Sequence, residues 1–480
     1  MSRINTNVTA LLSARVLNLN NASLNKSLER LSTGLRINRG ADDPAGLIAS
    51  ENLRKQIRGT ETGVKNAERA INIIGTAEGA LAEINTMLLD LQGLLGEAAN
   101  SGGMSTEEIN ANQSQVDSIL NSVNRISNST EFAGIKLLNG NLDYTTGTLP
   151  AAIADATVKA AKLIDGAAMT VAVAVTTSAN TGVAFLSGAQ LTSTAMTLRV
   201  GSNRGTTDLT FAASTTQANV LAGVNAVKEI TGVSAAISAG AIALRSKDFG
   251  TDAYVSISIL SGQSAAVANM VLNTDNASNN ASVSDTGVDA VATINGVAAT
   301  ADGKKLSIRT SMLDATIELT AAAAMAATST SFTITGGGAD FSIGPKVDAN
   351  ALESIGIQNI ATTSLGNAVD GYLSTLKTGG TNALTGNNLY TAQRIVTDSI
   401  TDVSDLRGRM GSFQKNTLET TIRSLSIGKE NLLSAESALR DTDFATETGK
   451  MTRAQILVQA STMVLAQSNM APQTVLSLLG

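Results

Sequence analysis

Few residues in this 480-residue sequence are of types that carry out catalysis. It contains no Cys, His or Trp, which excludes a disulfide framework, a thiolate nucleophile, a zinc–thiolate site and the commonest general base. The only catalysis left open is one that uses carboxylate, Lys or Tyr side chains. The nearest approach to a catalytic arrangement is the carboxylate pair Asp441 and Asp443. We interpret this pair as the solvated start of a helix, because two nearby carboxylates alone have no specificity.

Motifs for other chemistry are missing as well. The sequence has no glycine-rich phosphate loop ending in Gly-Lys-Ser/Thr, no EF-hand pattern and no Gly-x-Ser-x-Gly turn. Its 34 basic and 40 acidic residues give a net charge of −6, and aromatic residues make up 2%. A nucleic-acid binder needs a basic surface and stacking side chains, which this composition lacks. We therefore expect a structural protein that is not an enzyme and uses no cofactor or metal.

The sequence also predicts no membrane insertion, because no segment reaches the ~18 consecutive apolar residues of a membrane-spanning helix. The residues between Arg3 and Arg15 lack the apolar core of a cleaved secretory signal. If the protein leaves the cell, we expect it to use another route.

Leucines recur every seven residues near the N-terminus, at Leu17, Leu24 and Leu31. This spacing predicts a helix with one apolar stripe, which Gly34 and Gly40 then weaken. The C-terminal part has the same character. There, an apolar stripe from about residue 388 leads into leucines at seven-residue steps, Leu418, Leu425, Leu432 and Leu439.

Two further helices are predicted after the first one. Asp43 can cap the second helix, and Pro44 suits its first position because proline has no amide hydrogen to leave unbonded. The apolar stripe of this helix continues to about residue 100 and indicates a nearly straight helix. Ser105 and Glu108 form a capping box for an antiparallel third helix. The glycine-containing run 128–141 then predicts a hairpin.

The apolar faces at the two chain ends need a partner. A last helix is expected from about Glu447 to Ser468, before Pro472 and an apolar tail. We expect the terminal segments to pack against each other and against neighbouring copies of the chain. The predicted self-assembly residues are Leu17, Leu24, Leu28, Leu31, Leu35, Ile456, Leu457, Val464, Leu465, Leu476 and Leu479.

The middle of the chain differs from both ends. It is rich in Gly, Ala, Ser and Thr, and residues 294–320 alternate like strands around an Asp302-Gly303 turn. Residues 196–211 repeat part of this pattern, and residues 236–260 add further strands. This region predicts a small β-rich module, present up to twice, which decorates the surface.

The predicted fold is mainly α with a β-rich insertion: long antiparallel coiled-coil helices from both chain ends and an outward-facing β domain in the middle. Residues 1–42 and 443–480 are expected to form the inner core of a polymer, and residues 43–145 and 385–442 a helical bundle. Residues 146–384 are expected to form the outer β-rich region.

Three segments of the sequence resemble the bacterial flagellins: residues 31–59, residues 125–140 and residues 438–480. Within them stand LSTGLRINRGADDPAG, RISNSTEFAGIKLLNG and the terminal SNMAPQTVLSLLG. The segment INGVAATADGKKLSIRT also resembles an internal repeat of many flagellins. The resemblance implies a subunit that polymerises into the flagellar filament for swimming motility. An alternative is a hook–filament junction protein of the same superfamily.

The resemblance also implies partners and a location. It implies a helical homopolymer outside the cell, and export by the flagellar type III apparatus without a cleaved signal peptide. An export chaperone would bind the C-terminus, at about Asp443 to Gly480, and hook-associated and cap proteins would contact the filament. In flagellins that activate the animal flagellin receptor, Arg and Glu occupy the positions of Gly93 and Gly96. The resemblance therefore predicts weak recognition of this chain by that receptor.

Two alternatives from other classes were considered. A filament-borne zinc peptidase needs His-Glu-x-x-His, which a chain without His cannot supply. An adhesin or a glycan-bearing surface fits the Ser/Thr-rich middle, where Asn276 and Asn280 begin short Asn-x-Ser sequons.

Overall fold

The computed structural model describes residues 6–476 except 101–102, 164–165, 188–194, 239, 262–281, 368–369 and 387. Both sequons, at Asn276 and Asn280, and the predicted assembly residue Leu479 lie outside the described residues. The chain divides into two compact units. The first unit comprises Met1–Glu68, Ile343–Ala351 and Glu419–Gly480, and the second comprises Arg69–Ser342 and Leu352–Leu418.

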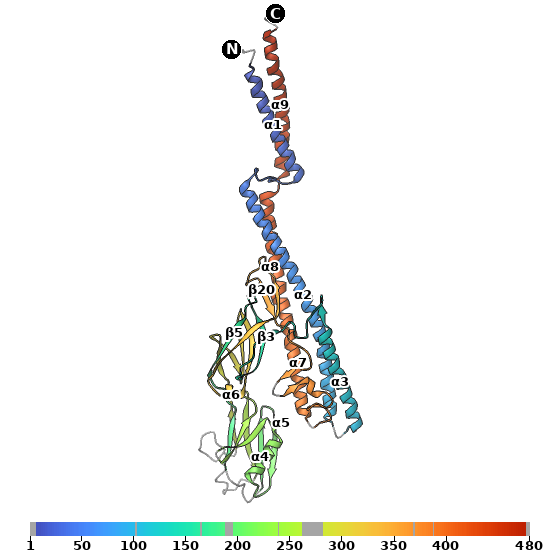
Figure 1. Ribbon diagram of the computed structural model, residues 1–480, viewed down its shortest axis with the longest axis vertical. Helices are drawn as coiled ribbons and strands as arrows, with labels where there is room; N and C mark the ends of the chain where they lie inside the picture. Colours follow the sequence, from blue (N-terminus) through green and yellow to red (C-terminus); the bar gives the residue numbers. More distant parts are fainter. Residues whose placement is uncertain are drawn as a thin grey trace. The chain divides into compact units, whose positions relative to one another are not determined.

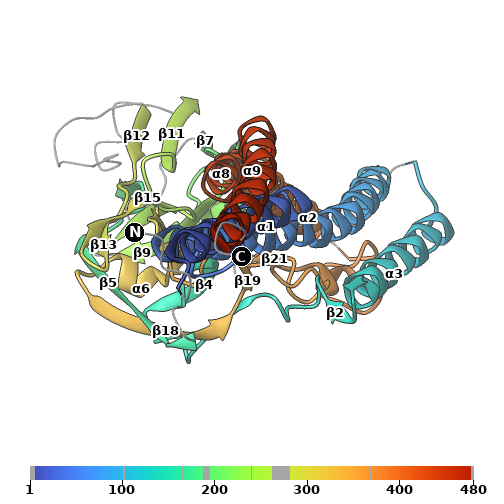
Figure 2. The same ribbon diagram turned by 90° about the horizontal axis from the view of Figure 1, so that it is seen from above.

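In the first unit, the two ends of the chain form an antiparallel pair of helices. Helices α1 (Val8–Thr33) and α9 (Phe444–Leu476) lie side by side in both views (Figures 1 and 2). Helix α1 ends at Thr33, because Gly34, which the sequence indicated only as a weak point, adopts a left-handed conformation with φ of 72°. Its amide donates to the Arg30 carbonyl at 2.9 Å, which closes the last turn.

Hydrogen bonds join the two chain segments that continue from this pair. The Arg36 amide donates to the Arg440 carbonyl at 2.7 Å, and the Thr442 amide donates to the Gly34 carbonyl at 2.9 Å. Helix α2 (Pro44–Ala98) then begins as predicted, with Asp43 Oδ1 accepting from the amide of the third helical residue at 2.9 Å. The conformational break at residues 34–43 is thus fixed by backbone contacts.

Helix α8 (Glu419–Arg440) pairs with the first part of α2. Lys429 lies 2.9 Å from Glu61, and Arg440 lies 3.0 Å from Glu51. The leucine stripe of α8 is half-buried, in agreement with its seven-residue spacing in the sequence. These exposed pairs add little stability by themselves, but they fix which faces of the helices meet.

A loop of the first unit, residues 343–351, packs on α2 at two glycines one helical turn apart. A Cβ atom at Gly59 would lie 2.2 Å from the Pro345 carbonyl oxygen, and one at Gly63 would lie 2.9 Å from the Ile343 oxygen. Any side chain at either position would push the loop away. The two glycines therefore make the groove in which residues 343–351 lie.

The helical part of the second unit consists of the rest of α2 together with α3 (Thr106–Ser129) and α7 (Leu389–Ser412). The predicted capping box of α3 is confirmed, since Ser105 Oγ accepts from the Glu108 amide and Glu108 accepts from the Ser105 amide. Figures 1 and 2 show α2 and α3 side by side. Their predicted apolar stripes are buried, with Leu81, Leu88 and Val116 fully covered.

A π-helical segment, η3 (Phe413–Leu418), separates α7 from α8. Val403 and Met410 are buried seven residues apart, but the next buried residue of the stripe, Leu418, comes eight residues later. The wider π turn accommodates this extra residue without breaking the helix.

Several short elements connect these helices to the β-rich region. The predicted hairpin at residues 128–141 is confirmed as β1 (Glu131–Phe132) paired with β2 (Ile135–Lys136). The remaining short elements are β19 (Ala339–Ser342), β20 (Leu352–Ile355), β21 (Gly366–Asn367), β22 (Gly371–Tyr372) and the 3-10 helix η2 (Leu373–Leu376).

The β-rich middle contains two modules, each built from two antiparallel sheets around its own core. The sheets of the first module have the strand orders β14-β13-β5-β18-β3 and β15-β16-β17-β4. Its elements are β3 (Tyr144–Thr146), β4 (Ile153–Ala161), β5 (Met169–Thr177), β13 (Val291–Ile294), β14 (Val297–Ala298), β15 (Thr300–Asp302), β16 (Lys305–Arg309), β17 (Leu313–Leu319), α6 (Ala321–Ala324) and β18 (Ser329–Gly337).

The second module is inserted between β5 and β13 of the first. Its sheets have the orders β6-β10-β9 and β12-β11-β7-β8. Its elements are β6 (Val183–Ser187), β7 (Met196–Ser202), β8 (Gly205–Phe211), α4 (Gln217–Ala226), α5 (Lys228–Thr231), β9 (Val233–Ser238), β10 (Ala241–Ser246), β11 (Tyr254–Ser261) and β12 (Ser282–Thr286). Its two ends meet, since Asn180 and Val288 exchange backbone hydrogen bonds of 2.9 and 3.0 Å.

The repeated sequence pattern corresponds to one hairpin in each module. Residues 196–211 form β7 and β8, and the matching part of residues 294–320 forms β16 and β17. Each hairpin carries the same cross-strand ion pair: Arg199 with Asp208 at 2.7 Å, and Arg309 with Asp314 at 3.0 Å.

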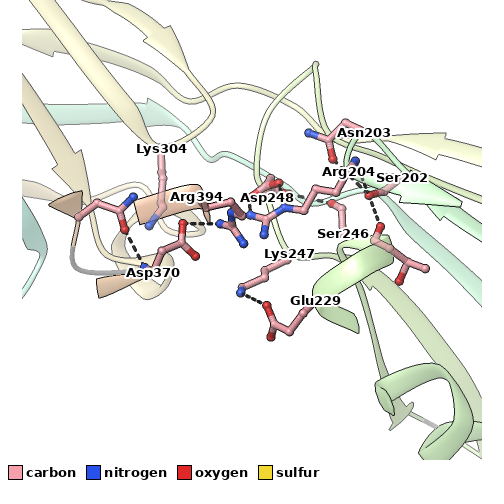
Figure 3. A network of polar contacts seen from close by, with 12 residues as sticks. Ser202, Asn203, Arg204, Glu229, Ser246, Lys247, Asp248, Lys304, Asp370 and Arg394 are labelled. Atoms are coloured by element: carbon pink, nitrogen blue, oxygen red, sulfur yellow. Dashed lines mark hydrogen bonds and ion pairs between the residues drawn. The ribbon is translucent and has the colours of Figure 1, made fainter. Parts of the chain in front are cut away.

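Charged side chains of the second module and of helix α7 lie near each other within the second unit (Figure 3). Arg204, in the β7–β8 turn, makes a two-pronged contact with Asp248. Arg394 of α7 pairs with Asp370, and α5 also packs on α7. The side chain of Asp370 is 6% exposed and that of Arg204 is 15% exposed, so both ion pairs are partly shielded from water.

One expectation about the fold was wrong. Helix α9 begins at Phe444 and continues through Pro472 to Leu476, whereas the sequence indicated a helix of residues 447–468 that ends before the proline. The start differs because Asp443 caps the helix. The end differs because the helix continues past Pro472, although proline cannot donate the regular hydrogen bond to the carbonyl four residues before it. In the part of the chain that the structure describes, no helix combines the length and apolarity needed to cross a membrane.

Candidate assembly interface

The α1–α9 pair has a covered face on each helix with seven-residue spacing. On α9 the covered positions fall into two series, Glu447, Ala454, Ser461, Ser468 and Met451, Val458, Leu465. On α1, Leu17, Leu24 and Leu31 are half-buried. The contact therefore sets one series of mainly small and polar residues and one series of larger apolar residues of α9 against the leucines of α1.

Polar contacts fix the register of this pair at three levels. Asn7 Nδ2 donates to the Ser468 carbonyl at 2.8 Å, and Asn20 Nδ2 donates to Ser461 Oγ at 2.7 Å. Ser27 Oγ donates to Glu447 Oε1 at 2.8 Å. Because a polar side chain in a helix seam must find its partner, a slide of one turn would break all three contacts between the helices.

Glu447 is the buried charge of the pair, with a side chain that is 5% exposed. Its second oxygen lies 3.2 Å from Lys450 Nζ and 3.7 Å from Arg30 Nη1. Burial alone would raise the pKa of Glu447. The hydrogen bonds from Ser27 and Lys450, with the charges of Lys450 and Arg30, outweigh burial and lower that pKa.

The predicted self-assembly residues fall into two groups. Five are half-buried: Leu17, Leu24, Leu31, Leu35 and Leu465. Four are exposed: Leu28 at 44%, Ile456 at 60%, Leu457 at 44% and Val464 at 57%. Leu476 ends α9, and its side chain, like Leu479, lies outside what the structure describes. The stripe Leu17, Leu24, Leu31 is thus partly covered within the chain, while the exposed group stays largely uncovered among the described residues.

Further exposed apolar residues escaped the sequence analysis. On α1 they lie mainly opposite the face that contacts α9, and α9 adds three more. They are Val8, Leu11, Leu12, Val16 and Leu19 on α1 and Phe444, Met463 and Met470 on α9, each at least 40% exposed. The sequence does contain a sign of exposed apolar residues, because α9 carries the consecutive runs Ile456-Leu457-Val458 and Met463-Val464-Leu465. Three consecutive residues point in three directions from a helix, so one partner helix cannot cover them all.

The outside of α9 is divided into an apolar and a polar strip. The apolar strip contains Ile456, Met463 and Val464, with the exposed Arg453 and Gln467 on the same side, and the polar strip contains Gln455, Gln459, Thr462 and Asn469, all exposed. A groove of about 850 Å³ along α9 is lined by residues that include Phe444, Thr448, Arg453, Ile456 and Leu457. One helix thus offers a covered, an apolar and a polar face.

The carboxylate pair singled out in the sequence has structural partners. Asp443 Oδ1 accepts from the Ala445 amide at 3.0 Å, and Oδ2 accepts from Thr446 Oγ1 at 2.6 Å. These hydrogen bonds cap α9 and lower the pKa of Asp443. Asp441 accepts from Ser437 Oγ at 2.6 Å. Within the described ranges, no group of three or more Asp and Glu side chains is arranged to hold a metal ion.

Comparison with known proteins identifies the family. Residues 4–143 match the bacterial flagellin N-terminal helical region, and residues 394–479 match the bacterial flagellin C-terminal helical region. A flagellin of Clostridium tyrobutyricum is 29% identical over 98% of this chain and 100% of its own length. The chain belongs to the bacterial flagellin family. It is a structural subunit of the bacterial flagellar filament. The alternative, a hook–filament junction protein of the same superfamily, has no better support from these comparisons than the filament subunit.

Other similarities are more limited in extent. A flagellin of Bacillus subtilis is 42% identical over 30% of this chain and 48% of its own length. The D2–D3 domains of a flagellar cap protein from Serratia marcescens are 15% identical, covering 35% of this chain and 92% of that chain. The TM-score of this pair is 0.26, too low to indicate a common fold. The family is a structural one rather than an enzyme family.

Proposed function

We propose that subunits of this flagellin polymerise through the apolar sides of α1 and α9 that their mutual contact leaves uncovered. The observation that carries this proposal is the set of exposed side chains Leu11, Leu19, Ile456, Met463 and Val464, each between 57% and 73% exposed. Monomeric surfaces rarely expose such long apolar strips. In a filament, neighbouring copies of the same two helices would cover them.

Each α1–α9 pair acts in this proposal as one antiparallel coiled-coil unit of the filament core. The seven-residue spacing of its covered residues and its polar register contacts support that assignment. The register contacts keep the apolar strips of the two helices aligned, so that a neighbour meets one continuous surface.

The β modules then face outward from the core. The position of the second module as an insertion supports this assignment, because its two ends meet at Asn180 and Val288 and its core is separate from that of the first module. A region that is inserted with its two chain ends together and has its own core can vary or be lost while the chain on either side stays connected.

Before assembly, the same C-terminal surface needs protection. We assign residues 443–480 as the binding region of an export chaperone, with the groove along α9 as the contact. Export through the flagellar type III apparatus without a cleaved signal, and contacts with cap and hook-associated proteins, complete the proposal.

Seeded polymerisation tests the proposed interface. Purified protein is mixed with short filament seeds, and the pelleted fraction is measured and viewed by electron microscopy. We expect the seeds to elongate, and we expect the same from a chain without residues 182–287, which gives thinner filaments. If the full chain stays soluble with its helices folded, the assigned interface is wrong. If only the shortened chain fails, the second module supplies essential contacts.

A further inference from the structure

Asn7 makes hydrogen bonds with both terminal helices at once. Its Oδ1 accepts from the Ala10 amide at 3.0 Å, which caps the first turn of α1. Its Nδ2 donates to the carbonyl of Ser468 on α9 at 2.8 Å. One side chain therefore uses its acceptor for its own helix and its donor for the other.

The carbonyl that Asn7 contacts is not an ordinary helical carbonyl. Within α9, the Ser468 oxygen would accept from the amide four residues later, which is Pro472. Proline has no amide hydrogen, so this regular bond cannot form. Asn7 supplies the missing donor at the position where the sequence predicts that the helix should stop.

We propose that Asn7 and Pro472 form a lock between the two ends of the chain. The helix beyond Ser468 is stabilised when Asn7 is in place, and the first turn of α1 is fixed to α9 by the same residue. The proline makes the end of α9 depend on α1, because without it the helix would satisfy its own carbonyl. This inference rests on the proposed function, since it describes how the two assembling helices are ordered together.

Combining substitutions at the two positions tests the lock. Asn7→Ser keeps a capping oxygen but is too short to reach Ser468, and Pro472→Ala restores the amide hydrogen. The readout is hydrogen exchange of the backbone amides of residues 470, 471 and 473–476 in seeded filaments of the full chain. Asn7→Ser should lower their protection by about three- to ten-fold, the loss of one hydrogen bond. In the Pro472→Ala background, Asn7→Ser should change the protection of these amides by less than about two-fold, since the Ser468 carbonyl then accepts from the amide of residue 472.

Asn20 provides a matched control on the same helix. It also donates across the pair, to Ser461 Oγ at 2.7 Å, but no proline lies four residues after its partner. The effect of Asn20→Ser should be the same in the unmodified chain and in the Pro472→Ala background. Equal effects of Asn7→Ser in both backgrounds would overturn the lock. Failure of the unmodified chain to elongate seeds would instead count against the proposed function.

Discussion

Replacing Val464 by Asp should abolish polymerisation at ordinary protein concentrations. Val464 is 57% exposed in the single chain, so about half of the ~1.5–3 kcal/mol gained by fully burying a valine remains for assembly, or about 1 kcal/mol. Burying an unpaired carboxylate adds a penalty of at least about 3 kcal/mol. The sum of about 4 kcal/mol corresponds to a roughly thousand-fold rise in critical concentration, at about 1.4 kcal/mol for each factor of ten.

The assay is the concentration of soluble protein that remains after seeded growth. Gln459→Glu is the matched control, because it places the same charge on the polar strip of α9, and its critical concentration should stay within a few-fold of the unmodified value. Val464→Leu should polymerise normally. If Val464→Asp polymerised at the unmodified concentration, Val464 would not be at an interface and the apolar strip would need another explanation.

Three further changes have defined outcomes. Gly59→Ala should displace the loop 343–351 and speed the hydrogen exchange of that loop. Gly75→Ala on the same helix, whose Cβ would meet no described atom within 4 Å, should instead raise the free energy of unfolding by about 1 kcal/mol. Equal effects of the two substitutions in thermal unfolding would contradict the close packing of the loop on Gly59. Burial raises the pKa of Asp402 to about 6, so the folded state binds a proton more tightly than the unfolded state. The free energy of unfolding should therefore fall as pH rises from about 4 to about 6, and Asp402→Asn should remove that slope in urea titrations at several pH values. Gly93→Arg combined with Gly96→Glu should strengthen signalling through the animal flagellin receptor in a cell reporter assay, since both positions face open space; strong signalling by the unmodified chain would refute this.

Local signals in the sequence were sufficient for the starts of two helices and for several turns. Asp43 with Pro44, Ser105 with Glu108, and Gly34 each act within one helical turn, so their effect follows from residue type and spacing. The hairpins of the β-rich middle were predictable for the same reason, because alternation and a tight turn are local properties.

Features that depend on distant contacts could not be predicted in this way. The continuation of α9 through Pro472 depends on a donor that lies 461 residues from its acceptor in sequence. The fit of residues 343–351 on α2 also required three-dimensional information, since nothing in the sequence distinguishes Gly59 and Gly63 from the rest of the 42 glycines. In the candidate interface, the leucine spacing identified helices that pair, but it did not show which residues remain uncovered. That depends on the small residues of α9 as much as on the leucines.

The π turn at η3 has a consequence for how this chain tolerates changes in length. The stripe of α7 and the leucine stripe of α8 each keep a seven-residue period, and they are offset from each other by one residue. A single inserted residue would normally rotate everything after it by about 100°. Here the wider π turn accommodates the extra residue, so the apolar stripe of α7 and the leucine stripe of α8 each keep their own seven-residue repeat. Removal of one residue from 413–418 would therefore be compensated there, by conversion of the turn to regular α-helix, while the same deletion within α8 would misalign every following leucine.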